Sequence, residues 1–182
     1  MNKKKILLLC LILALLSMSA VGTYANYTRT DIATNTITTG SVDMIIHETG
    51  LGGAPYPTDP VVILPGDVVN KVVTVENNGN QPMYLRVRLT PGVNDPALSA
   101  QDCIRMDINH TDWIARDGYY YYNQVLNPGE TTLPLLTKVT FVGEKITNAY
   151  LGKLFSLDVA VFAVQSVHNG DSPLEAQGWP EM

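Results

Sequence analysis

The chain contains few cysteines, few charged residues, and few phenylalanines and tryptophans. Its 182 residues include two Cys, three Phe and two Trp, and 16% of them are charged. Because Cys10 lies in an apolar N-terminal run, the chain beyond that run has one cysteine, Cys103, and no disulfide can form within it. Stability must therefore come from packing. We expect the Cys103 side chain to be buried, as free cysteines commonly are; a bridge between two chains is the alternative.

The sequence also lacks the local motifs of the common enzyme classes. It has no His-Glu-x-x-His, no Gly-x-Ser-x-Gly, no phosphate-binding glycine loop and no paired-cysteine motif. The three histidines, His47, His110 and His168, stand far apart and lack the spacing of a zinc site. We therefore expect no enzymatic activity and no resident cofactor.

The N-terminus is organised as an export signal. Lys3 to Lys5 precede an apolar run from Ile6 to Leu16, and small residues follow. Thr23 at position −3 and Ala25 at position −1 predict cleavage after Ala25, and a cut after Gly22 fits the same peptidase motif. We expect a secreted protein.

An uncleaved membrane anchor is the alternative interpretation of this segment. A spanning helix needs about 20 apolar residues, whereas this run is interrupted at Ser17 and Ser19 and is followed by a polar stretch. We therefore expect a signal peptide at 1–25 and no stable membrane insertion after its removal.

Positive charge is scarce in the remaining 157 residues, 26–182. Loss of Lys3 to Lys5 leaves nine of the twelve Lys and Arg against 17 Asp and Glu, a formal charge of 9 minus 17, or −8. Nucleic-acid binding requires clustered Lys and Arg, and no basic run remains. The length suits one cored domain, placed at 40–182 after an extended segment at 26–39. Calcium or low pH should reduce the repulsion between such subunits.

Polar and apolar residues alternate with the period of a β-strand through most of the chain. The expected strands are 41–47, Val68–Glu76, Met83–Thr90, Gly118–Tyr122, Leu135–Val142 and Leu154–Gln165. The last is apolar on both faces, which predicts a central strand. Arg86 and Arg88 fall on an outward face, where solvent or a cross-strand charge pair is expected. Helical structure is expected only at Ala97–Arg105 and as a turn near Leu174–Gln177.

Turn signals stand between these strands. Asn77-Asn78-Gly79-Asn80 favours positive φ and predicts a tight hairpin between the second and third strands. Two Pro-Gly turns, at Leu64–Asp67 and Leu126–Glu130, each lead into a strand. Short alternating strands with closely spaced turns predict an all-β antiparallel sandwich of jelly-roll or related Greek-key winding, with one or two short helices.

One local cluster of oxygen ligands is present. Asp107, Asn109 and Asp112 offer carboxylate and amide groups that suit a hard cation such as Ca²⁺. The cluster lacks the sixth-position glycine and twelfth-position glutamate of a helix-loop-helix calcium loop, and Trp113 interrupts it. A calcium site is one interpretation, and an ordinary polar loop between strands is the other.

Four consecutive tyrosines, Tyr119 to Tyr122, follow Trp113 closely in the sequence. Alternate residues of a strand face opposite sides, so we expect two tyrosines in the core and two on the sheet surface. A glycan-binding face formed by Tyr120, Tyr122 and Trp113 is the alternative.

The segment from Asn26 to Thr39 is polar and rich in threonine, which favours an extended backbone. Such a strand can pair with the sheet of its own chain or with that of the next subunit, which gives an open head-to-tail assembly. The residues assigned to this strand are Asn26, Tyr27, Thr28, Thr30, Ile32, Thr34, Thr36 and Ile37.

Three parts of the sequence resemble the TasA/camelysin family, secreted matrix proteins of Gram-positive bacteria. The block 20–48, which includes Asn26–Asp31 and Thr38–Met44, is similar to the family's leader and first strand. The stretch from Leu64–Asp67 through Val75–Gly79 resembles its hairpin, and Gly178-Trp179-Pro180 is similar to C-terminal ends in the group.

The resemblance implies a jelly-roll sandwich whose signal is removed by a SipW-type signal peptidase. It further implies fibres of the extracellular biofilm matrix, in which each subunit lends residues 26–39 to a neighbour, with other matrix proteins as further partners. Camelysin-like members raise a surface metalloprotease as a competing class, although no open metal site is visible in the sequence. A monomeric adhesin is the third class.

Overall fold

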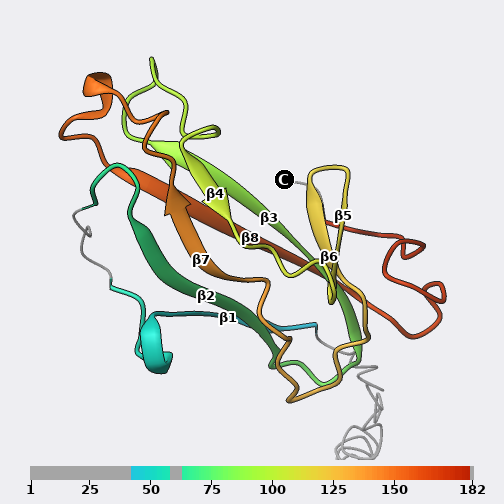
Figure 1. Cartoon of the computed structure of the whole chain (residues 1–182). Helices are drawn as coiled ribbons and strands as arrows, with labels where there is room; N and C mark the ends of the chain where they lie inside the picture. Colours follow the sequence, from blue (N-terminus) through green and yellow to red (C-terminus); the bar gives the residue numbers. More distant parts are fainter. Residues whose placement is uncertain (1–41, 58–62, 181–182) are drawn as a thin grey trace, which may run out of the picture. The chain divides into compact units, whose positions relative to one another are not determined.

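Eight antiparallel strands form two sheets in the computed structural model, which describes residues 42–57 and 63–180 (Figure 1). One sheet has the strand order β1-β2-β7-β4 and the other β5-β6-β3-β8. The predicted all-β antiparallel sandwich is confirmed, and its jelly-roll winding stays a prediction. The strands are β1 (Met44–Thr49), β2 (Val68–Asn77), β3 (Met83–Val93), β4 (Ile104–Met106), β5 (Trp113–Arg116), β6 (Tyr119–Tyr122), β7 (Leu136–Phe141) and β8 (Phe155–Gln165).

The core lies between the two sheets, because alternate side chains of each strand point inward. Val73 and Val75 of β2 are fully buried, and they belong to two clusters that join inward residues of both sheets. Trp113 is also fully buried; its indole N–H donates to the carbonyl oxygen of Leu133 (3.1 Å), and its ring lies 5.0 Å from that of Tyr122. Burying one such aromatic side chain contributes roughly 2–3 kcal/mol.

The helix expected at Ala97–Arg105 is wrong. This segment forms turns that lead into β4. Side chains compete with the helical bonds there: Asp95 Oδ1 accepts from the N–H of Ala97, and Ser99 Oγ from the N–H of Gln101. Short 3₁₀ turns occur at Leu51–Gly53 (η1) and Asn148–Tyr150 (η2), and the turn expected near Leu174–Gln177 lies at 173–175. Within the described ranges, no helix is long and apolar enough to cross a membrane.

The hairpin expected at Asn77–Asn80 is also wrong. β2 and β3 belong to different sheets, so the connection carries the chain across the sandwich. Gly79 does not adopt a positive φ. The Asn77 side chain is buried instead, where it accepts from the N–H of Gly79 (3.0 Å) and donates to the carbonyl oxygens of Gln81 (2.9 Å) and Leu126 (2.8 Å). The Asn-Gly pair thus closes a local turn without pairing the strands.

β8 was expected in the middle of a sheet, but it lies at an end and, among the described strands, pairs with β3 alone. Ser156 and Asp158 on its outward face are exposed. Phe162 and Val164, further along the same face, are buried, and Val164 packs against Ala176 and Trp179 of the C-terminal segment. The second apolar face of β8 is therefore explained by cover from the chain's own C-terminus.

Candidate functional site

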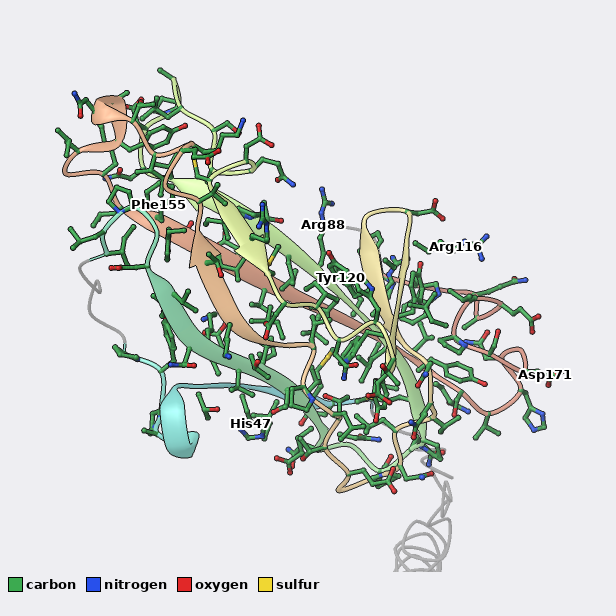
Figure 2. The ribbon with its side chains drawn as sticks, in the orientation of Figure 1. His47, Arg88, Arg116, Tyr120, Phe155 and Asp171 are labelled. Carbon is green, nitrogen blue, oxygen red and sulfur yellow. The ribbon has the colours of Figure 1, made fainter. Side chains whose placement is uncertain are left out.

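Two adjoining hollows lie along the first half of β8, between its edge and the facing sheet. The larger has a volume of about 710 Å³, and the smaller, of about 440 Å³, lies between β1 and residues 157–159 of β8. Leu157 lines both, so the two hollows lie next to each other along β8, and we call them together the β8 groove. Phe155, the first residue of β8, is labelled in Figure 2 and lines the larger hollow. The residues used below are Ile46, Glu48, Val69, Lys71, Phe155 and Leu157.

The groove opens onto the hydrophobic core. Its larger hollow is lined by Ile104, Val139 and Phe141, which belong to the buried cluster shared by the two sheets. Two leucines in its wall, Leu64 and Leu151, are largely exposed. An apolar groove beside the free edge of a strand offers both main-chain hydrogen-bonding groups and pockets for alternate side chains. It can therefore hold an extended peptide.

An ion pair lies on the inward face of the sheet at this groove. Nζ of Lys71 is 2.9 Å from Oε1 of Glu48 and 4.0 Å from the ring centroid of Tyr56, and the Lys71 side chain is only 8% exposed. Burial and, after it, the negative charge of Glu48 raise the pKa of the Tyr56 hydroxyl. Tyr56 therefore stays neutral, and its ring forms a cation–π contact with the ammonium group of Lys71.

A second feature is the C-terminal segment 166–180, which we call the C-terminal strap. Tyr84 donates to the carbonyl oxygen of Gly170 (3.2 Å), and the amide of Asn169 bonds to the backbone at both Gln165 and Gln177. The indole N–H of Trp179 donates to the carbonyl oxygen of Ala176 (3.0 Å). The strap forms a small second core on the outer face of the sheet that contains β3 and β8.

Arg86 holds the end of this strap through aromatic rings. Its guanidinium carbon lies 4.0 Å from the ring centroid of Tyr119 and 4.7 Å from that of Trp179. It donates to the hydroxyl of Tyr121 (3.2 Å) and to the carbonyl oxygen of Pro180 (3.4 Å), and its Nε is buried without a hydrogen-bond partner. The expectation of a solvated or charge-paired Arg86 is wrong, because the strap and the tyrosines enclose it.

The tyrosines alternate between the two faces as expected, but Tyr121 on the outer face is buried instead of lying on the surface, and the glycan-binding alternative fails for its named residues. Tyr122 is buried and Tyr120 packs against the same core cluster, with Trp113 at its centre. Tyr119 and Tyr121 face the other way, toward Arg86. The Cys103 thiol is buried, as predicted, which leaves it unsuited to an interchain bridge.

The three expected calcium ligands are used in different ways. The carboxylate of Asp107 faces β7, where it accepts from the backbone N–H groups of Thr137 (2.8 Å) and Lys138 (2.6 Å) and from the Thr137 hydroxyl. Asn109 donates instead to the carboxylate of Asp112 (2.8 Å). Burial raises the pKa of Asp107, but these hydrogen bonds outweigh it and lower the pKa below the usual value.

No group of three or more His, Cys, Asp or Glu side chains that could hold a metal occurs in the described part of the chain. His47 lies 2.7 Å from a carboxylate oxygen of Glu76 on the neighbouring strand. The predicted cleavage residues, Thr23 and Ala25, and the predicted strand at 26–39 lie outside the described residues.

We did not predict the β8 groove or the Glu48–Lys71 ion pair within it from the sequence. Nor did we predict that the rings of Tyr119 and Trp179 enclose Arg86, an arrangement that we call the Arg86 cage. One signal for the ion pair was present: Lys71 falls in phase with the inward residues Val73 and Val75. A charged residue at such a position requires a partner. In comparisons with known proteins, neither a family model nor a curated protein matches the chain.

Proposed function

We propose that the protein is a secreted structural subunit that assembles head to tail, each copy lending residues 26–39 to the β8 groove of the next. The observation that carries this proposal is the β8 groove, apolar in its larger hollow, which lies beside an edge of β8 that no other described strand occupies. Added strands bind through main-chain hydrogen bonds, with pockets receiving alternate side chains. Contacts of this heterologous kind generate open filaments when the rotation between subunits does not close a ring.

The dimensions of donor and acceptor support the proposal. The segment 26–39 has fourteen residues, and β8 has eleven. The segment is rich in threonine and carries Tyr27, Ile32 and Ile37, which offer apolar groups to a groove. The N-terminal leader supports export of the protein from the cell. The resemblance to the TasA/camelysin family supports assembly in the biofilm matrix or at the cell surface, with other matrix proteins as further partners.

The experiment compares the secreted protein with a variant lacking residues 26–39, by electron microscopy and size-exclusion chromatography with light scattering. A second variant, in which a Gly-Ser linker of equal length replaces 26–39, controls for chain length. We expect fibres from the first protein and monomers from both variants. Monomers from all three, in neutral, acidic and calcium-containing buffer, would contradict self-assembly.

A further inference from the structure

The β8 groove contains charge as well as apolar side chains. Glu48 pairs in register with Val73, two residues beyond Lys71, so Glu48 and Lys71 are diagonal neighbours on the inward face of β1 and β2. Glu48 borders the smaller hollow and Lys71 the larger. The ion pair therefore lies where the two hollows adjoin, and a strand laid along β8 passes it.

An ion pair at this place is a poor source of stability. Burying the Lys71 ammonium group costs about as much as its attraction to Glu48 returns, although the Glu48 side chain stays 35% exposed, and apolar residues of similar size often do as well. In some proteins, buried polar or ionic groups instead select one register over others. Lys71 has three N–H donors, and its contact with Glu48 uses one, so it can donate to a second carboxylate.

The segment 26–39 contains two charged residues, Arg29 and Asp31. They are two positions apart, so on an extended strand they lie on the same face, about 7 Å from each other. Their signs are opposite, as are those of Glu48 and Lys71. Placed beside the ion pair in one register, they complete a set of four alternating charges.

We infer that the Glu48–Lys71 pair sets the register of the donated strand, with Arg29 binding Glu48 and Asp31 binding Lys71. This inference rests on the proposed strand donation and names the side chains that the groove selects. A slip of one residue turns both donor charges to the opposite face. A slip of two in either direction brings one pair of like charges together and leaves the other donor charge without its partner, which is unfavourable.

Charge reversal on each side tests the inference. The secreted protein is compared with Arg29→Asp/Asp31→Arg, with Glu48→Lys/Lys71→Glu, and with the variant that carries all four changes. We expect polymerisation, followed by light scattering, to slow about tenfold or more in each double variant and to return to within about threefold of the parent in the fourfold variant. Recovery in the fourfold variant is a result that a folding defect does not produce.

Two controls sharpen the result. The variant Thr28→Arg/Arg29→Thr/Thr30→Asp/Asp31→Thr keeps the composition and moves both charges to the other face of the strand, and it should polymerise as slowly as the donor reversal. In the neutral groove variant Glu48→Gln/Lys71→Met, polymerisation should be equally fast with the parent segment 26–39 and with the segment that carries Arg29→Asp/Asp31→Arg. Circular dichroism establishes that each variant is folded before its assembly is measured.

Two failures are distinguishable. If both double variants polymerise like the parent while the protein lacking 26–39 stays monomeric, register selection by charge is overturned and strand donation stands. Slow polymerisation of the fourfold variant in a folded state likewise overturns it. If the protein lacking 26–39 still forms fibres, the proposed function itself fails.

Discussion

Arg86 shows how one residue ties the end of the chain to the sandwich. Its guanidinium group contacts Tyr119 and Trp179, which lie 60 residues apart in the sequence, and within the described part of the chain it forms no ion pair with a carboxylate. The planar group stacks on ring faces and still donates in its own plane. A lysine can offer the charge without that geometry.

Replacing Arg86 by Lys should therefore loosen the C-terminal strap. We expect a loss of about 1–2 kcal/mol in the free energy of unfolding, from the stacking on Tyr119 and Trp179 and the bond to Tyr121. Urea denaturation measures it. The matched control is Arg116→Lys, because the Arg116 side chain is 56% exposed at the β5–β6 turn (Figure 2) and should change stability by less than about 0.5 kcal/mol. Equal effects of the two substitutions would contradict the role of the cage.

The stability of the fold should depend on pH through the carboxyl group of Asp107. Its pKa is lowered in the folded state, with burial opposing the stronger hydrogen bonds from Thr137 and Lys138. A lowered pKa means that the contribution is complete above the unfolded value, near 3.9, and is lost as the pH falls through the folded value. The stability advantage over Asp107→Asn should be about 1 kcal/mol at pH 7 and should shrink below pH 4, as thermal unfolding at several pH values can measure. A constant difference between pH 7 and pH 3 would be inconsistent with this.

At the scale of elements, local alternation is what the sequence predicts best. The six expected strands correspond to β1, β2, β3, β6, β7 and β8. β5 was missed although Asp117-Gly118 gave a hairpin signal, and both residues adopt positive φ in the turn to β6. β4 was missed because two of its three residues, Ile104 and Arg105, fall at the end of the helix predicted at Ala97–Arg105.

Which strands pair with each other, and which segments pack on them, could not be predicted from local alternation. The Asn-Gly signal after β2 predicts a turn, but whether the next strand returns to the same sheet depends on the side chain of Asn77 and on the distant residue Leu126. The apolar outward face of β8 likewise depends on a strap that follows it in the chain. Such contacts arise only on folding, and for that reason the groove and the cage were invisible in the sequence.

The crossover after β2 should depend on Asn77. Its replacement by Ala removes this donor from the buried carbonyl oxygen of Leu126 and the partly buried one of Gln81, and we expect a loss of about 2–3 kcal/mol in the free energy of unfolding. The neighbouring Asn78→Ala is the control. Asn78 is exposed and its side chain bonds to Asp43, so the loss there should stay within about 0.5 kcal/mol. Chemical denaturation that shows the reverse order would refute the role given to Asn77.

At the scale of the whole molecule, assembly should depend on the face of β1 that borders the groove. Ile46 lines the smaller hollow and is 39% exposed, whereas Ile45, on the other face, is 41% exposed. We expect Ile46→Lys to abolish fibres, because its long side chain would occupy the smaller hollow and its ammonium group would compete with the donated strand for Glu48, and Ile45→Lys to leave them intact. Electron microscopy of the two proteins separates a specific groove from general surface hydrophobicity, since loss of fibres in both would favour the latter.

The most direct test of strand donation mixes two chains with complementary defects. One lacks residues 26–39 and keeps an intact groove; the other carries Ile46→Lys and keeps its N-terminal segment. Neither should polymerise alone. Light scattering after size-exclusion chromatography should show a 1:1 heterodimer in the mixture that grows no further, because the donated strand fills the single intact groove. Only monomers in the mixture, with both chains folded, would contradict donation between subunits.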